Sequence, residues 1–140
     1  MGTSENKDVA RRFYEEVLNK RQLDLVDELA VNDYVEHDPL PGQGSGIVGL
    51  RDRLTALMTG LEPTFTIEDV IAEDDRVVVR WTNSGTHVAT FLGIPATGRS
   101  FSIPGIDIYR LDGGRLAEHW HVVDQLGQMV QLGLIPAQGT

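Results

Sequence analysis

The sequence predicts an α+β fold, in which helices cover one face of a curved antiparallel sheet and leave a cavity between the two layers. Apolar residues recur with the period of a helix before Pro63 and with the period of a strand after it. A run of helices followed by a run of strands is typical of α+β proteins and not of alternating α/β proteins. The chain has 140 residues and no visible repeat or linker, so we expect one domain over residues 1–140.

Three helices are expected before Pro63. Ser4 is the expected N-cap of the first helix, whose apolar stripe is Val9, Ala10, Phe13, Tyr14, Val17 and Leu18. A shorter helix fits Asp24–Ala30. Residues 32–46, NDYVEHDPLPGQGSG, are dense in turn formers and are predicted to be a loop. The third helix is ended by Gly60 and Pro63, and its apolar positions are Leu50, Leu54, Leu57, Met58 and Leu61.

Four strands and a last helix are expected after Pro63. The strands are predicted at residues 64–75, 76–87, 98–114 and 115–123. Turns at 74–75 and 112–114 join them into two hairpins. The connection VATFLGIPAT is apolar without periodicity, which suits either a lid over a hydrophobic ligand or a surface against a second copy. Asp124 is expected to cap the last helix, Gly133 to end it, and its inward residues to be Leu126, Met129 and Val130.

The amino-acid composition excludes several classes of binding partner and of chemistry for this protein. The net charge of −9 and the pI near 4.7 describe a surface that repels phosphate backbones and anionic lipid, so we expect no nucleic-acid or membrane partner. Cysteine is absent, which excludes disulfides and thiolate chemistry. No apolar run approaches the length of a membrane span, and the N-terminus lacks an apolar signal region, so the cytoplasm is the expected location.

Strand alternation sorts the polar residues of the last two strands. If Asp107 and His121 face the cavity, then Tyr109 and His119 face it as well. The outer face then carries an apolar set: Ile106, Ile108, Trp120 and Val122. A monomer would not leave that set against water, so a homodimer is expected.

Five segments of the chain resemble one family. These are YVEHDP, VVVRWTNSGTH, FLGIPATGRS, IDIYRLDGGRLAEHW and the closing LGxxxQLG, in this order between the predicted elements. Together they resemble the SnoaL-like polyketide cyclases of the nuclear transport factor 2-like superfamily. The resemblance covers nearly the whole chain. It implies a cone-shaped α+β barrel whose curved sheet wraps around the N-terminal helices.

The resemblance also implies an activity and its residues. The aromatic polyketide cyclases of this family close a ring by an intramolecular aldol reaction, without a metal or an organic cofactor. Their acid–base aspartate falls on His121 of this sequence, and their assisting histidine falls on Asp107. The two residue types are therefore exchanged here, which puts the aldol reaction itself in question and leaves acid–base chemistry in place.

His121 and Asp107 are the predicted catalytic residues. The carboxylate of Asp107 would fix the tautomer of the His121 ring and raise its pKa, so that the other ring nitrogen exchanges protons near neutral pH. The alternative is a buried His–Asp pair that only stabilises the sheet. His119 and His121 also share a face, but no third ligand is required by spacing, so no metal is expected.

The predicted function is a cofactor-independent enzyme that acts on a small hydrophobic carbonyl compound, as cyclase or isomerase. The residues expected to position the substrate are Tyr34, His37, Trp81, Asn83, Tyr109 and His119. Two alternatives are an epoxide hydrolase of the same fold, for which no Asp-Arg-Asp arrangement is visible, and a binding domain without catalysis.

Overall fold

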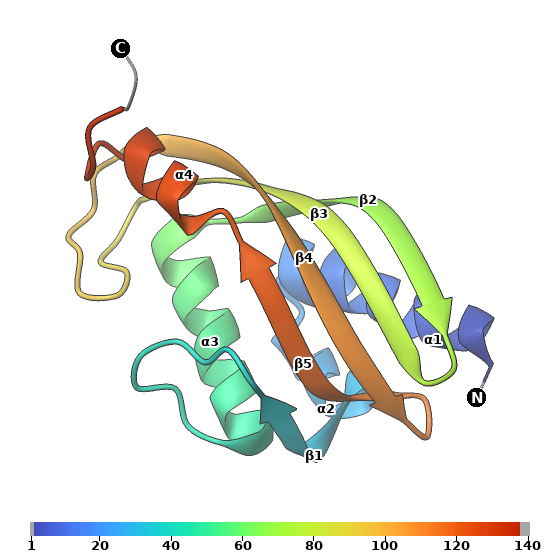
Figure 1. Ribbon diagram of the computed structural model, residues 1–140. Coiled ribbons are helices and arrows are strands. Elements are labelled where there is room, and N and C mark those ends of the chain that lie inside the picture. Colours follow the sequence, from blue (N-terminus) through green and yellow to red (C-terminus); the bar gives the residue numbers. More distant parts are fainter. Residues whose placement is uncertain (1, 138–140) are drawn as a thin grey trace.

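A computed structural model describes residues 2–137 and has one five-stranded sheet with helices on its concave side (Figure 1). The helices are α1 (Thr3–Arg12), α2 (Val26–Leu29), α3 (Gly46–Leu61) and α4 (Gln125–Gln131). The strands are β1 (Ala30–Glu36), β2 (Thr64–Glu73), β3 (Arg76–Thr86), β4 (Ser100–Asp112) and β5 (Arg115–Val123). In the described part of the chain, no helix is both long and apolar enough to cross a bilayer.

The sheet has the order β1-β5-β4-β3-β2. The four strands predicted after Pro63 are confirmed, and each neighbouring pair among them is antiparallel. The sheet is nevertheless mixed, because β1 runs parallel to β5. The predicted α+β class and cone-like architecture are confirmed, but the purely antiparallel sheet is not.

Strand β1 corrects the prediction of a loop over residues 32–46. Its first residue pairs with Leu116, and Val35 pairs with Glu118, with an irregularity between the two. Asn32 and Asp33 are exposed in this irregular part, so the segment shows no regular alternation. Residues 30–36 form a strand because they pair with β5, which lies far away in the sequence. Local sequence patterns do not reveal such a pairing.

Two details of the helices also differ from the prediction. Ser4 lies inside α1, whose N-cap is Gly2 and has no side-chain cap. In α4, Leu126 is 57% exposed. The buried residues at this end are Gln128 and Leu132, because the short helix turns that side toward the sheet. The cap at Asp124 is confirmed, since its carboxylate accepts a hydrogen bond from the Gly127 amide at 2.9 Å.

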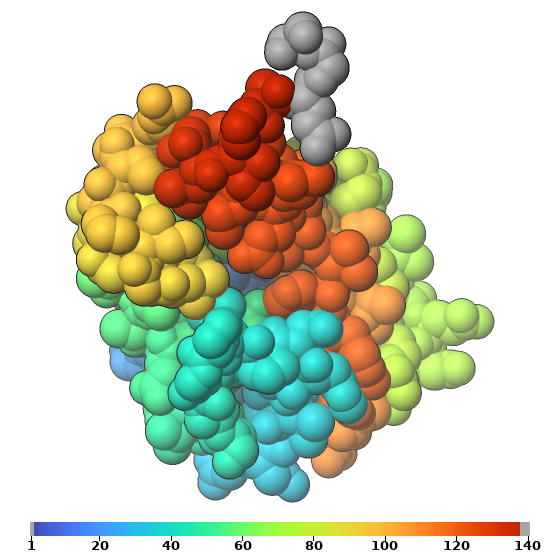
Figure 2. Space-filling view, turned by 60° about the vertical axis from the view of Figure 1, so that its left-hand side comes forward, coloured from blue at the N-terminus to red at the C-terminus, as the bar shows by residue number. Residues whose placement is uncertain are grey.

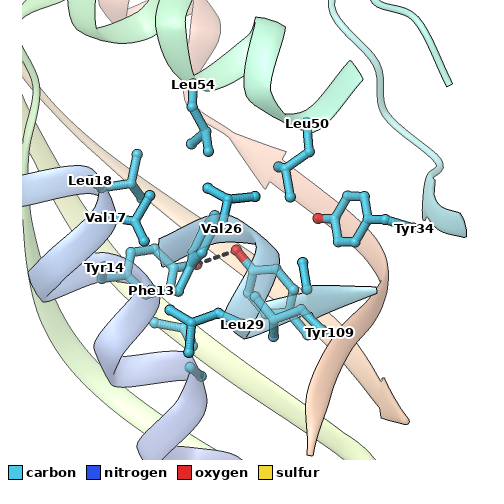
Figure 3. Packing of buried hydrophobic residues seen from close by; sticks show 14 of the residues in the cluster. Phe13, Tyr14, Val17, Leu18, Val26, Leu29, Tyr34, Leu50, Leu54 and Tyr109 are labelled. Atoms are coloured by element: carbon cyan, nitrogen blue, oxygen red, sulfur yellow. Dashed lines mark hydrogen bonds between the residues drawn. The ribbon is translucent and has the colours of Figure 1, made fainter. Parts of the chain in front are cut away.

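The hydrophobic core fills the space between the helices and the inner face of the sheet. Figure 3 shows side chains of the N-terminal helical region meeting Leu50 and Leu54 of α3 and Tyr109 of β4. The helical region contributes Phe13, Tyr14, Val17 and Leu18, which are all buried. The chain continues from α1 with a wider π-helical geometry through Phe13–Asn19. The predicted apolar stripe therefore faces the core, although only its first part is regular α-helix.

Alternation along β4 is as predicted. Residues at odd positions from Phe101 to Leu111 are buried and those at even positions are more exposed. Gly105 belongs to the inner set and lies opposite Trp81 of β3. A Cβ atom at Gly105 would overlap the Trp81 ring. The glycine therefore leaves the space on the inner face that the Trp81 ring occupies.

We expect Gly105→Ala to lower the free energy of unfolding by about 1–3 kcal/mol, because the added methyl group overpacks a filled part of the core. Chemical denaturation of both proteins measures the change. Ser102→Ala, on the exposed face of the same strand, is the control and should change stability by less than about 0.5 kcal/mol. A Gly105→Ala protein as stable as its parent would show that Trp81 does not need this space.

Candidate active site

A cavity of about 120 Å³ lies between the helices and the inner face of the sheet. Figure 2 shows a hollow on the surface between residues of the 87–99 loop (yellow), the 37–45 segment (cyan) and the β5–α4 region (red). Most of the lining is apolar and includes Leu50, Leu54, Leu57, Leu61, Phe65 and Ile103. An apolar cavity with a few polar groups is the usual form of a small-molecule site.

The carboxylate of Asp107 is the centre of the polar groups at one end of the cavity. It is buried, and its Oδ2 atom accepts hydrogen bonds from the Tyr14 hydroxyl and, at 2.7 Å, from the indole N–H of Trp81. Its Oδ1 atom lies 2.9 Å from Nε2 of His119. Burial alone raises the pKa of Asp107, but the bonds from His119, Tyr14 and Trp81 outweigh it and lower the pKa. Asp107 is therefore ionised.

His119 lies between two carboxylates. Its Nε2 faces Asp107, and its Nδ1 lies 2.6 Å from Oε2 of Glu36 on β1. Ionised carboxylates only accept hydrogen bonds, so both ring nitrogens carry protons. Burial by itself lowers the pKa of His119, but the hydrogen bonds to Asp107 and Glu36 raise it to about 9. His119 is therefore a buried imidazolium near neutral pH.

His121 is in the opposite state. Burial lowers its pKa, and the positive charges of Arg53 and His119 lower it further, so the ring is neutral near pH 7. Its Nδ1 lies 2.9 Å from Nη2 of Arg53. A guanidinium only donates, so Nδ1 accepts and the proton of the neutral ring is on Nε2. Two imidazoles with centroids 5.2 Å apart thus hold different numbers of protons.

The predicted hydrogen-bonded pair of His121 and Asp107 is wrong. The two residues are direct partners in the β4–β5 register, as alternation implied, but the atoms Nδ1 and Oδ1 are 4.0 Å apart. His119 reaches Asp107 diagonally and takes the hydrogen bond instead, since diagonal neighbours on one face of a sheet are within reach of long side chains. Asp107 consequently raises the pKa of His119, while the pKa of His121 is lowered.

Sequence reasoning missed Arg53 and Glu36. Arg53 extends from α3 toward both His121 and Glu36, and its Nη1 lies 3.4 Å from Oε1 of Glu36 and donates to the Asp38 carbonyl at 2.9 Å. A signal for Arg53 existed, because it lies on the apolar stripe three residues after Leu50. Glu36 gave no such signal, since its strand was expected to be a loop.

The ligand atoms of Glu36, His119 and His121 lie within 4.8 Å of one another, as in a metal site. A metal at this set would have to compete with protons and with Arg53 for these atoms. Metal binding requires an unprotonated nitrogen, so it would have to release a proton from His119, whose two nitrogens face the carboxylates of Glu36 and Asp107. The guanidinium of Arg53 already provides a cation beside His121 and Glu36.

Most of the residues predicted to bind substrate line the cavity. Tyr34, Trp81, Asn83, Tyr109 and His119 all belong to its wall. The hydroxyl groups of Tyr109 and Tyr14 lie 2.8 Å apart, and burial raises the pKa of both phenols well above the usual value, so they remain protonated.

His37, which was also expected to position the substrate, does not line the cavity. Its ring stacks on Trp120 at a centroid distance of 4.7 Å, and its Nε2 lies 2.6 Å from Glu118. Both partners lie on the outer face of β5. The reason is the alternation of β1, which turns Tyr34 and Glu36 inward and therefore turns the next residue outward.

Comparisons with known proteins match the chain to one family. A family model described as "SnoaL-like polyketide cyclase" matches residues 8–132. The aklanonic acid methyl ester cyclase DauD of Streptomyces sp. (strain C5) is 31% identical over 138 residues, which cover 90% of this chain and 80% of that protein. The aklanonic acid methyl ester cyclase DnrD of Streptomyces peucetius is also 31% identical, with coverages of 90% and 89%.

Two solved structures are similar over almost their full length. TsrD from Streptomyces laurentii has a TM-score of 0.88 and 30% identity, covering 96% of this chain and 99% of its own. Wild-type IdmH from Streptomyces antibioticus has a TM-score of 0.79 and 28% identity, with coverages of 91% and 98%.

The two carboxylates around His119 predict a pH dependence of stability. Because the folded pKa is raised, the stabilisation is fully present below pH 6.5, the pKa of the unfolded ring, and is lost as the pH rises to about 9. The free energy of unfolding should fall by roughly 3 kcal/mol across this window, at 1.36 kcal/mol per pKa unit. Denaturation curves at several pH values measure it.

His119→Gln should remove most of this fall, whereas His37→Gln, on the outer face, should keep it. Nuclear magnetic resonance titration of the ring protons gives a second readout in the parent protein. A His119 ring that loses its proton below pH 7 would contradict the assignment.

Proposed function

Because this chain belongs to the SnoaL-like polyketide cyclase family, we propose that it is a cofactor-independent cyclase that closes a ring in a hydrophobic polycarbonyl compound by an aldol-type reaction. The family match and the curated relatives support the reaction class. The observation that carries the proposal for this site is the different surroundings of two neighbouring imidazoles: His119 lies between two carboxylates, and His121 accepts from Arg53. These surroundings raise the pKa of His119 and lower that of His121. Groups whose surroundings push their pKa values apart are typical of acid–base sites.

His121 is the proposed general base and acid. An aldol closure begins when a base removes a proton from a carbon beside a carbonyl group. The carbanion then forms a C–C bond to a second carbonyl carbon, whose oxygen takes up a proton to become a hydroxyl group. Neutral His121 can take the first proton on one ring nitrogen, and the resulting imidazolium can then give a proton to that oxygen, so atoms and charge balance without a cofactor.

Arg53 controls which nitrogen of His121 can act. Its hydrogen bond occupies the lone pair of Nδ1, while Nε2 carries a proton that can be donated to a substrate oxygen. Proton uptake at Nδ1 requires Arg53 to give up this bond. The remaining contacts of Arg53, with the Asp38 carbonyl and Glu36, keep the guanidinium near the site when it does so.

Asp107 is the proposed positioning residue. It acts through His119 and not through a direct bond to His121. The ion pair keeps a positive charge beside the His121 ring, and this charge favours the negative enolate that forms when the substrate loses its proton. In the cyclase pattern the base is an aspartate and a histidine assists it. In this chain the proposed base is a histidine, His121, and the carboxylate of Asp107 acts on it through His119.

The alternatives are less well supported. Epoxide hydrolysis is not favoured, because the family model and both curated relatives are described as cyclases. A binding domain without catalysis would not need two histidines in different protonation states.

We also propose that the protein forms a homodimer, in which the outer faces of the two sheets are in contact. Ile106 is 43% exposed and Val122 is 76% exposed, and Ile108 lies beside them in register. Trp120 continues this surface and is covered on its two sides by His37 and the Arg76 guanidinium.

His121→Ala should reduce turnover by roughly 10²–10⁴-fold, the usual contribution of a positioned acid–base group, with little change in stability. Aklanonic acid methyl ester, the compound named for the two cyclases, is the first substrate to test. Chromatography can follow its conversion into a product of unchanged mass. Turnover of the parent protein should fall as the pH drops below 6.5, because protonated His121 cannot act as base.

Asp107→Asn should also reduce turnover, and the double variant should be no slower than His121→Ala, because the residues act together. His37→Ala is the matched control and should keep parental turnover. Near-normal turnover by His121→Ala together with a much lower melting temperature would mean that this ring is structural.

Sedimentation equilibrium at micromolar concentration should give twice the 15.4 kDa mass of the chain. Val122→Lys should shift the protein to the monomer, because a charge on the buried contact is costly to desolvate. Val48→Lys introduces the same side chain at an exposed valine of α3 and should leave the dimer intact. A parent protein with the mass of one chain would refute the dimer.

A further inference from the structure

Two carboxamide side chains are buried at the end of the cavity away from Asp107. Asn83 of β3 is 4% exposed and Gln128 of α4 is 7% exposed, and both line the cavity. Oδ1 of Asn83 is enclosed without a donor among residues 2–137. The side-chain amide of Gln128 also has no partner among these residues, but its polar atoms are not fully enclosed and face the cavity. Buried polar groups without partners are rare in folded proteins, so this pair calls for a physical reason.

The register of the sheet places these amides far from the acid–base groups. Asn83 lies opposite Ile103, and Asp107 follows Ile103 four residues later on β4, which corresponds to about 13 Å along a strand. Helix α4 is attached at the same end, where Gln131 hydrogen-bonds both the amide and the carbonyl of Ser102. The amides of Asn83 and Gln128 therefore share the end formed by β3, β4 and α4.

The surroundings of these amides are apolar. Leu57, Leu61, Phe91 and Ile103 line this end of the cavity. Leaving a buried amide without a partner costs about 1–3 kcal/mol, and a leucine or methionine of similar shape would avoid that cost. Stability alone does not account for an unpartnered amide at Asn83. A ligand that formed the missing hydrogen bonds would account for it.

We propose that Asn83 and Gln128 form a subsite for an uncharged hydroxyl group of the ligand. A hydroxyl both donates and accepts, so it can satisfy the carbonyl oxygen of one amide and the NH₂ group of the other. The charged residues of the cavity wall, Arg53, Asp107, His119 and His121, surround the opposite end, so an ionised group has no counter-charge here.

The subsite fixes the direction in which a substrate enters the cavity. With its hydroxyl at Asn83 and Gln128, a ligand presents its other end to His121. This consequence rests on the proposed cyclase function, whereas binding of the hydroxyl does not. A site built for a hydroxyl group rejects an analogue that lacks it far more strongly than an apolar pocket distinguishes two shapes.

Two probes of matched size test the subsite: 2-naphthol, which carries a hydroxyl group, and 2-methylnaphthalene, which carries a methyl group in its place. Calorimetry should show that the parent protein binds 2-naphthol roughly ten- to a hundredfold more tightly, the range expected for a satisfied buried amide. In Asn83→Leu and in Gln128→Met this preference should fall to about twofold, the remainder expected when the other amide stands alone. Both variants should fold with a melting temperature equal to or above that of the parent.

Gln125→Met is the matched control, because Gln125 is an exposed amide that also lines the cavity. It should keep the preference for 2-naphthol. Side-chain amide resonances of Asn83 and Gln128 should shift with 2-naphthol and stay in place with 2-methylnaphthalene, which locates the hydroxyl directly.

Three results would overturn the proposal: no binding of 2-naphthol, equal affinity for the two probes, or a preference that survives in both amide variants. A preference lost in His121→Ala and kept in Asn83→Leu would place the hydroxyl at the other end. Because these measurements need no turnover, they succeed or fail independently of the cyclase assay.

Discussion

A single buried negative charge, the carboxylate of Asp107, organises this molecule. An ionised carboxylate cannot remain in an apolar core unless hydrogen-bond donors surround it. The donors come from the N-terminal helical region (Tyr14), β3 (Trp81) and β5 (His119), so three separate segments must meet at one point on β4. Trp81 reaches it only because the facing residue is glycine.

The protonation states of the site follow from that charge. Asp107 holds a proton on His119, and the resulting imidazolium is balanced on its other side by Glu36. Glu36 in turn attracts Arg53, whose guanidinium donates to His121. With Arg53 and His119 both positive, the pKa of His121 is lowered and its ring stays neutral near pH 7. The protonation state of His121 therefore depends on a chain of contacts that runs from Asp107 through His119, Glu36 and Arg53 to His121.

Sequence patterns predicted the parts of this arrangement that are local. The period-two pattern placed Asp107, Tyr109, His119 and His121 on one face, and the apolar stripe of the N-terminal helix placed Tyr14 beneath them. Contacts between distant segments were not predictable in the same way. Whether His119 or His121 reaches Asp107 depends on side-chain direction across a strand pair, and β1 is a strand only because β5 lies beside it. His37 was misplaced for the same reason, since its direction follows from that unpredicted strand.

The parallel pairing of β1 with β5 has a consequence for how the protein becomes active. The hydrogen bond between Glu36 and His119 joins residues 83 positions apart, and its two strands lie near opposite ends of the chain. Contacts of such high sequence separation form late, since loop-closure entropy must be overcome before they stabilise anything. A chain still emerging from the ribosome cannot pair Glu36 with His119 before β5 has been made. The raised pKa of His119, which depends on Asp107 and Glu36, therefore arises only after the last strand has been synthesised.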